Sequence, residues 1–253
     1  MDTNEQKTTD TLKMAAEQFD MAGDDLKGFE DVRMDTMAVP FVRIAQKLTP
    51  QIEEDNPDQI PGLKEGDFFN TLTKDGYGKT LRCIVLKFEH IYIEWKPNRG
   101  GFVGYHDVEN AERIAVDRTF GAWKTKEGNL LQENYVYMIL VDGHESEGPC
   151  VLSLSSSMIK AAKEWNRLMV THVMENGVKA RPYYLIWQLT NEKRSNEKGS
   201  WFAPVIKFEG YVNERQYALT KEERLALPER RVDYAALAAP EQTQSDLASQ
   251  PGY

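Results

Sequence analysis

The alternation of apolar and polar residues becomes strand-like from the second quarter of the chain onwards. Phe68–Leu72 predicts a short strand that ends at a Lys-Asp-Gly turn, and Thr80–Trp95 predicts a long one. Even-numbered residues from Ile84 to Tyr92 share one face of the long strand, because side chains alternate along a strand. The opposite face changes from polar to apolar after Glu89, which predicts a β-bulge near that residue.

Further segments predict the remaining strands and one long helix. Tyr135–Val141 is apolar on both faces, which is typical of a central strand. Serines at 155–157 offer N-caps for a helix from Met158 to Glu175. The other predicted strands are Phe102–His106, Arg118–Lys124, Cys150–Leu154, Tyr183–Thr190 and Trp201–Glu209.

The segments on either side of these elements have a different character. In residues 40–49 the apolar positions follow i, i+3, i+4, i+7 spacing between two prolines, which predicts a helix that docks on the domain. Residues 1–38 are polar and acidic and predict a flexible arm. Residues 211–253 predict a short helix, over Lys221–Ala226, followed by a disordered tail.

The order of these elements predicts the fold. From Thr80 it runs strand, strand, strand, helix, strand, strand, once residues 101–125 are treated as an inserted β segment. An OB-fold has this order, with a long bent first strand and a helix before the two closing strands. We therefore predict a β-rich α+β protein in which residues 39–210 form an OB-like Greek-key barrel, with one long helix between strands and disordered termini.

Composition narrows the class of protein. Hydrophobic residues make up 41% of the 253 residues, enough for a sizeable core. The sequence has no apolar run of about 18 residues and no secretory signal at its start, so we expect no membrane span and a cytoplasmic location, in the host cell if the chain is of phage origin. Cys83 and Cys150 lie in apolar contexts and predict two buried thiols. Because the cysteines lack zinc-site spacing and the histidines are scattered, we expect no metal and no cofactor.

The net charge of −9 argues against a nucleic-acid partner, but its distribution changes that view. Residues 1–60 hold 14 acidic and 6 basic side chains, a net charge of −8. Residues 61–210 hold 19 acidic and 20 basic side chains, a net charge of +1. The predicted domain is therefore about neutral and can carry a local basic surface. The acidic arm either keeps the protein in solution, competes for that surface, or recruits a partner.

The segment from Lys87 to Lys126 mixes basic and aromatic side chains. Single-stranded nucleic acid needs this mixture, because cations contact phosphates and aromatic faces stack bases, at about 1–3 kcal/mol per base. A second mixture surrounds Trp201, where a hairpin loop is predicted. Packing of these rings in the core is the competing interpretation. The predicted nucleic-acid-binding residues are Lys87, Tyr92, Trp95, Lys96, Arg99, Phe102, Tyr105, Trp123, Lys124, Lys198 and Trp201.

Four segments carry a family resemblance. VPFVRIAQKLTP, GLKEGDFFNTLT, YIEWKPNRGGFVGYH and NEKGSWFAP are similar to proteins of tailed bacteriophages, over roughly residues 39–210. The resemblance implies a phage protein of replication or recombination, and single-stranded DNA binding on an OB-fold. One feature departs from phage single-stranded DNA-binding proteins, which often end in a strongly acidic tail. Here Asp246 is the one acidic residue among the last ten.

The function that these observations predict is non-catalytic binding of single-stranded DNA, with phage or host replication proteins as further partners and a homodimer left open. A protein-interaction factor is the alternative: a phage inhibitor of a host enzyme, or a replisome adaptor, acting through the acidic arm. A Mg²⁺-dependent nuclease is a third hypothesis, because Glu94-Trp95-Lys96 follows an apolar strand and Asp75 offers a second carboxylate.

Overall fold

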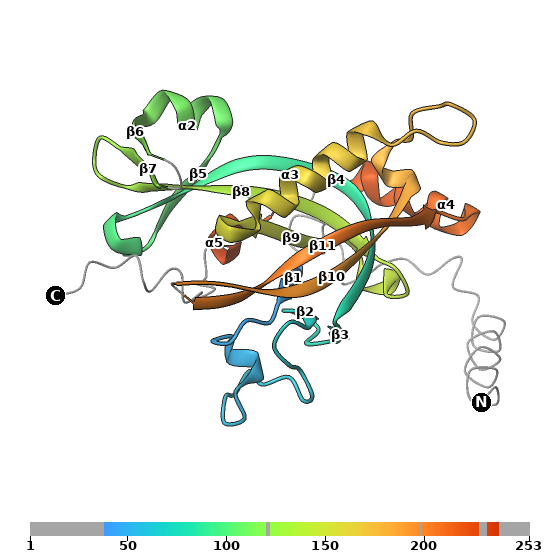
Figure 1. Cartoon of the computed structure of the whole chain (residues 1–253), viewed down its shortest axis with the longest axis horizontal. Helices are drawn as coiled ribbons and strands as arrows, with labels where there is room; N and C mark the ends of the chain where they lie inside the picture. Colours follow the sequence, from blue (N-terminus) through green and yellow to red (C-terminus); the bar gives the residue numbers. More distant parts are fainter. Residues whose placement is uncertain (1–37, 120–121, 198, 228–231, 238–253) are drawn as a thin grey trace, which may run out of the picture. The chain divides into compact units, whose positions relative to one another are not determined.

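The long strand β4 (Thr80–Trp95) organises the sheet. It pairs along its length with β8 (Leu130–Val141), antiparallel, so that Cys83 faces Val141 and Trp95 faces Leu130. The computed structural model describes residues 38–119, 122–197, 199–227 and 232–237. In these residues the strand order is β11-β10-β4-β8-β9-β1-β2-β3, with β5, β6 and β7 attached beside β4 and β8 (Figure 1).

The sheet contains these strands in addition to β4 and β8: β1 (Phe41–Ile44), β2 (Phe68–Asn70), β3 (Gly76–Gly78), β5 (Phe102–Asp107), β6 (Ala115–Thr119), β7 (Ala122–Thr125), β9 (Cys150–Ser155), β10 (Leu185–Asn196) and β11 (Gly199–Tyr211). The α-helices are α2 (Val108–Ile114), α3 (Ile159–Thr171), α4 (Glu214–Ala226) and α5 (Tyr234–Leu237). Short 3-10 turns cover Pro50–Ile52, Pro97–Arg99, Glu145–Glu147, Ser156–Met158 and Pro182–Tyr184.

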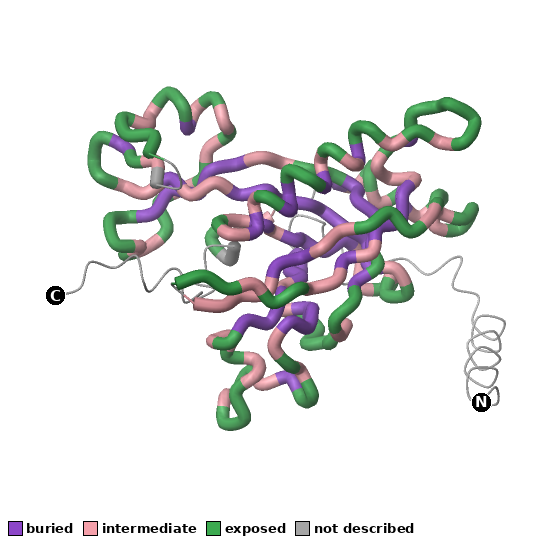
Figure 2. Tube along the Cα trace, viewed as in Figure 1, coloured by how far each residue is buried: buried purple, intermediate pink, exposed green. Residues whose placement is uncertain are grey.

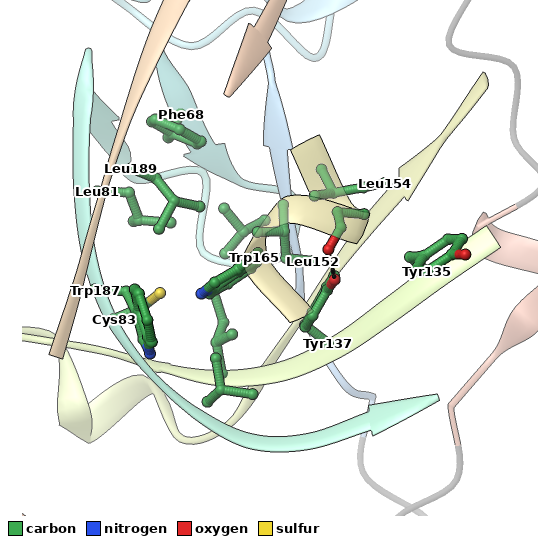
Figure 3. Packing of buried hydrophobic residues seen from close by; sticks show 14 of the residues in the cluster. Phe68, Leu81, Cys83, Tyr135, Tyr137, Leu152, Leu154, Trp165, Trp187 and Leu189 are labelled. Carbon is green, nitrogen blue, oxygen red and sulfur yellow. Dashed lines mark hydrogen bonds between the residues drawn. The ribbon is translucent and has the colours of Figure 1, made fainter. Parts of the chain in front are cut away.

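The curled sheet has an apolar core on each of its faces. On the inner face, α3 places Trp165 against Tyr137 of β8 and close to Trp187 of β10 (Figure 3). Cys83 and Cys150 are not joined by a disulfide, and both are buried in this inner core, as the sequence predicts. The buried residues follow the centre of the sheet, whereas the inserted segment and the loops are largely exposed (Figure 2).

The outer face is covered by the segment after β11. Ile91, Ile93 and Trp95 of β4 form the outer core with residues of β8, β9 and β1. Leu219 of α4, with Leu227, Val232 and Tyr234, packs on this core. The helix predicted over Lys221–Ala226 therefore begins earlier, at Glu214, where Asn213 forms a capping box with Gln216. Residues up to 237 belong in part to the fold, and the predicted tail beyond them lies outside the described residues.

The prediction of a docking helix at residues 40–49 is wrong. Phe41–Ile44 is strand β1, which pairs in parallel with β9 and antiparallel with β2. Val42 and Ile44 are 2% and 3% exposed, so the short apolar run is buried between two strands. A short apolar run fits a buried strand as well as one helical face, and the β-branched residues favour the strand. The arm predicted for residues 1–38 lies outside the described residues up to residue 37.

The observed architecture is a strand-rich α+β fold with a curled, half-barrel sheet, and this part of the prediction is confirmed. β4, β8, β9, α3, β10 and β11 follow one another in the predicted order, and β10 returns to pair with β4. The predicted insertion forms β5, α2, β6 and β7. β1 occupies the outer edge of β9, and in the described residues no backbone ladder joins β11 to β3.

A side chain bridges the open side of the half-barrel. The Gln46 amide donates to the carbonyl oxygen of Phe202 at 3.1 Å and accepts from its backbone N–H at 2.8 Å. Gln46 is 5% exposed, so this pair of bonds replaces a strand ladder in a buried setting. Beside it, Asn191 donates to the Gly66 carbonyl at 2.8 Å. A Cβ at Gly66, which has φ +83°, would lie 2.7 Å from the Phe202 ring, so only glycine fits there.

We expect Gln46→Ala to lower the free energy of unfolding by about 1–3 kcal/mol, because it leaves the N–H and C=O of Phe202 without partners in a partly buried site. Urea unfolding measures this change. Gln59→Ala, which removes a half-buried glutamine with no such bridge, is the control and should cost clearly less. Equal losses in the two variants would contradict the assigned role of Gln46.

Candidate nucleic-acid interface

The predicted binding residues lie on two opposite faces of the sheet. The bulge predicted near Glu89 is confirmed but lies earlier, between Val85 and Lys87, where the pairing of β4 with β8 shifts. From the bulge onwards, Tyr92 lies on the inner face and Trp95 on the outer face. Tyr105 is opposite Ile93 in β5 and therefore also faces outwards.

These rings do not share one open surface. Tyr92 is 5% exposed and Trp95 is 8% exposed. The Trp95 indole also donates to Gln132 Oε1 at 2.9 Å, as a structural tryptophan does. Tyr105 is 52% exposed, but its ring lies 4.1 Å, centroid to centroid, from that of Tyr234. Pleating of the strands separates residues that the sequence places side by side.

The other predicted residues are scattered. Lys87 is exposed and pairs with Glu89 at 2.9 Å. Trp201 packs against the inner core, and its indole N–H has no partner among the described groups. Lys96 and Lys124 are exposed, Arg99 is half-buried, Phe102 is 37% exposed and Lys198 lies outside the described residues. A binding role for these residues remains a prediction.

The inner face brings together a different set of rings, which we call the aromatic face: Phe88, His90, Tyr92, Trp123, Tyr135 and Tyr137. They meet because β4 and β8 pair residue by residue, with Phe88 opposite Tyr137 and His90 opposite Tyr135. His90 stacks on Tyr135 with ring centroids 4.5 Å apart, and Phe88 lies 5.1 Å from Tyr137. Phe88 is 37% exposed and the His90 side chain 27%, so this face is open to solvent at both residues.

The inserted segment extends the aromatic face beyond β8. Trp123 of β7 stacks on Tyr92 with centroids 4.8 Å apart and an interplanar angle of 20°. The guanidinium of Arg118 lies 5.3 Å from the centroid of Trp123, a cation–π contact. Trp123 is half-buried and Arg118 is exposed, so a ring and a cation are accessible at this end too.

Helix α3 carries three exposed cations beside the aromatic face. Lys160, Lys163 and Arg167 lie on one side of the helix, because residues at i, i+3 and i+7 share a face. We call them the α3 cation stripe. The Lys163 ammonium lies 5.9 Å from the Tyr135 ring centroid, so the stripe meets the rings at this residue. Neither Lys160 nor Arg167 has an acidic side chain at ion-pair distance within the described residues.

One carboxylate lies within the aromatic face. Glu133 is opposite Tyr92 in β8, and its Oε1 is 3.0 Å from His90 Nε2 and 3.8 Å from Lys163 Nζ. Burial, and then the charge of Glu133, raises the pKa of Tyr92 to about 12. Burial followed by Glu133 raises the pKa of Tyr135 as well. The face thus combines rings, a cation stripe and the partly exposed carboxylate of Glu133, and the exposed Glu164 lies on the same side of α3 as the stripe.

The carboxylate proposed for a nuclease lies in a different network. Glu94 is 8% exposed; its Oε2 is 2.7 Å from His106 Nε2, and its Oε1 accepts from Asn129 at 2.6 Å. His106 Nδ1 is 2.7 Å from the Asn110 amide, so both ring nitrogens are engaged. Asp75 lies in the turn before β3, and the length of β4 separates it from Glu94. The described residues contain no group of three or more His, Cys, Asp or Glu side chains arranged to hold a metal.

Sequence reasoning missed Phe88, His90, Tyr135 and the α3 cation stripe. The i, i+3, i+7 spacing of the cations was a usable signal, but a solvated helix face gives the same pattern. The sequence does not predict that Phe88 is partly exposed on the inner face, because the position of the bulge decides on which face its side chain lies.

Comparison with known proteins places the chain among phage sequences. A family model described as Pam3 phage gp34-like protein matches residues 6–232. No curated protein and no solved structure matches. None of the helices in the described residues combines the length and apolar character needed to cross a membrane.

We expect the free energy of unfolding to fall as the pH rises from about 10 to about 12. Burial raises the pKa of Tyr92 to about 12 and that of Tyr137 further above the ordinary value, so these hydroxyls stay protonated in the folded chain after they ionise in the unfolded one. Urea unfolding at stepped pH measures the decline. Tyr92→Phe should make it shallower. A decline of unchanged slope in Tyr92→Phe would show that Tyr92 does not contribute.

Proposed function

From the premise that the chain belongs to the Pam3 phage gp34-like family, we propose that it is a non-catalytic protein of phage replication or recombination that binds single-stranded DNA. The observation that carries the proposal is the contact between the aromatic face and the α3 cation stripe, made at Tyr135 and Lys163. Rings that are partly open to solvent and cations that face them are the two elements that single-strand binding requires.

In this proposal the α3 cation stripe binds the phosphates and the aromatic face binds the bases. Phosphates pair with Lys160, Lys163 and Arg167, while bases stack on the exposed parts of Phe88 and His90. A duplex keeps its bases stacked on each other, so the ring faces favour unpaired strands. Trp123 and Arg118 repeat the combination of ring and cation at the other end of the face.

The half-barrel also supports an OB-like relationship, which we include in the proposal. In OB-folds the ligand crosses the face of the central strands, between the loops that flank them. In this scheme β8 and β9 correspond to those central strands, β4 lies beside β8, and the β10–β11 hairpin corresponds to the flanking arm. β1, at the edge of β9, is an addition to that scheme.

A second candidate function, a protein-interaction factor such as a host-enzyme inhibitor or a replisome adaptor, draws support from a separate apolar patch. Val170, Val173 and Val178 are between 56% and 58% exposed. The ring of His172, next to them, lies 4.2 Å from Phe208, centroid to centroid. Clustered exposed apolar residues are typical of protein-binding sites.

We expect Phe88→Ala to weaken binding of a labelled single-stranded oligonucleotide about tenfold, because one stacking contact contributes about 1–3 kcal/mol. Fluorescence anisotropy measures the affinity, and thermal melting verifies that the variant is folded. Tyr105→Ala removes an exposed ring from the outer face and serves as the matched control, with affinity unchanged. Equal affinity of Phe88→Ala and the wild-type protein would remove the aromatic face from the site.

We expect Lys163→Ala/Arg167→Ala to weaken the same binding and to reduce the slope of log K against log salt by up to about 1.4, since each phosphate contact on a single strand contributes about 0.7. Lys221→Ala, on α4, is the charge control and should leave the slope unchanged. Absence of oligonucleotide binding by the wild-type protein, together with capture of a protein partner through the valine patch, would favour the second candidate.

A further inference from the structure

Glu133 is the acidic group that remains accessible on the aromatic face. Its side chain is 25% exposed, and it lies in the row of rings between Tyr92 and Tyr135. Glu94, on the same face of β4, is 8% exposed and bonded to His106 and Asn129. A base stacked on His90 therefore has one carboxylate beside its edge.

The carboxylate keeps capacity for a further hydrogen bond. His90 Nε2 is 3.0 Å from the Glu133 Oε1 atom, and the Lys163 ammonium is 3.8 Å from it. A carboxylate offers about four lone-pair sites and, when ionised, it only accepts. The neighbouring donors orient the Glu133 carboxylate but do not occupy all of its acceptor sites. A donor group of a ligand can therefore form a further hydrogen bond to it.

Bases differ in what they offer to a carboxylate. Cytosine carries an exocyclic amino group, and Glu and Asp accept hydrogen bonds from this group. Thymine presents a carbonyl oxygen at the same position, and two acceptors facing each other repel. At the neighbouring ring position N3 the order is reversed, because thymine N3 carries a hydrogen and cytosine N3 does not. The preference for cytosine therefore requires that the carboxylate meets the exocyclic group and not N3.

We propose that Glu133 selects among bases on the aromatic face, favouring single strands that present cytosine over those that present thymine. The inference rests on the proposed function and adds a base preference to it. Glu133 is a specificity residue in this scheme: His90 and Lys163 orient its carboxylate, and the stacked base donates to it.

The test compares two labelled oligonucleotides of equal length, oligo-dC and oligo-dT, at mildly alkaline pH and fixed salt. We expect the wild-type protein to bind oligo-dC about tenfold more tightly, as one good side-chain-to-base hydrogen bond discriminates by that order. In Glu133→Gln the preference should fall to about twofold or less, because an amide can donate as well as accept. The variant keeps an acceptor for His90, which protects the fold.

Glu209→Gln is the matched control. Glu209 is a carboxylate of similar exposure, paired with Arg82 at 3.0 Å on β11 away from the aromatic face, and its substitution changes the net charge equally. It should leave the ratio of the two affinities at the wild-type value.

The possible results distinguish failure of the proposed base preference from failure of single-strand binding itself. Wild-type protein that binds both oligonucleotides equally overturns the role of Glu133 and leaves single-strand binding intact. If Glu133→Gln binds oligo-dC and oligo-dT more tightly by the same factor, the proposed base preference is also overturned. Glu133 would then act only by competing with the phosphates for Lys163. Wild-type protein that binds neither strand overturns the proposed function itself.

Discussion

The pairing of β4 with β8 and the single irregularity within it decide what this protein presents to solvent. Side chains alternate along a strand, so one residue out of step exchanges the two faces for everything that follows. The bulge between Val85 and Lys87 makes that exchange in the middle of β4. It directs Phe88 and His90 into the inner face and leaves Trp95 in the outer core.

The sequence predicted the elements better than the surfaces. The bounds of β4 follow from the continuous pattern at Thr80–Trp95, and α3 follows from its amphipathic spacing. β1 was missed because four apolar residues between prolines do not distinguish a helix from a buried strand. The site was predicted only in its composition, since the faces of the rings depend on register, and register depends on a bulge whose position no local rule fixes.

Net charge gives little guidance about binding in this chain. The total of −9 includes the strongly acidic first 60 residues, while the folded middle is close to neutral. Within that middle, three cations and Glu164 on one side of α3 lie near a row of rings, and Lys163 is 3.8 Å from Glu133. The local arrangement of charges on this surface therefore cannot be read from the overall balance.

The bridge made by Gln46 has a mechanical consequence. A backbone ladder shares its strength among many bonds, but here two hydrogen bonds from one amide span the open side of the half-barrel to Phe202. The Asn191–Gly66 bond and the packing of the Phe202 ring on Gly66 support them at the same point. Closure of the half-barrel therefore depends here on a few side-chain contacts, whereas β10 is held to β4 by a backbone ladder.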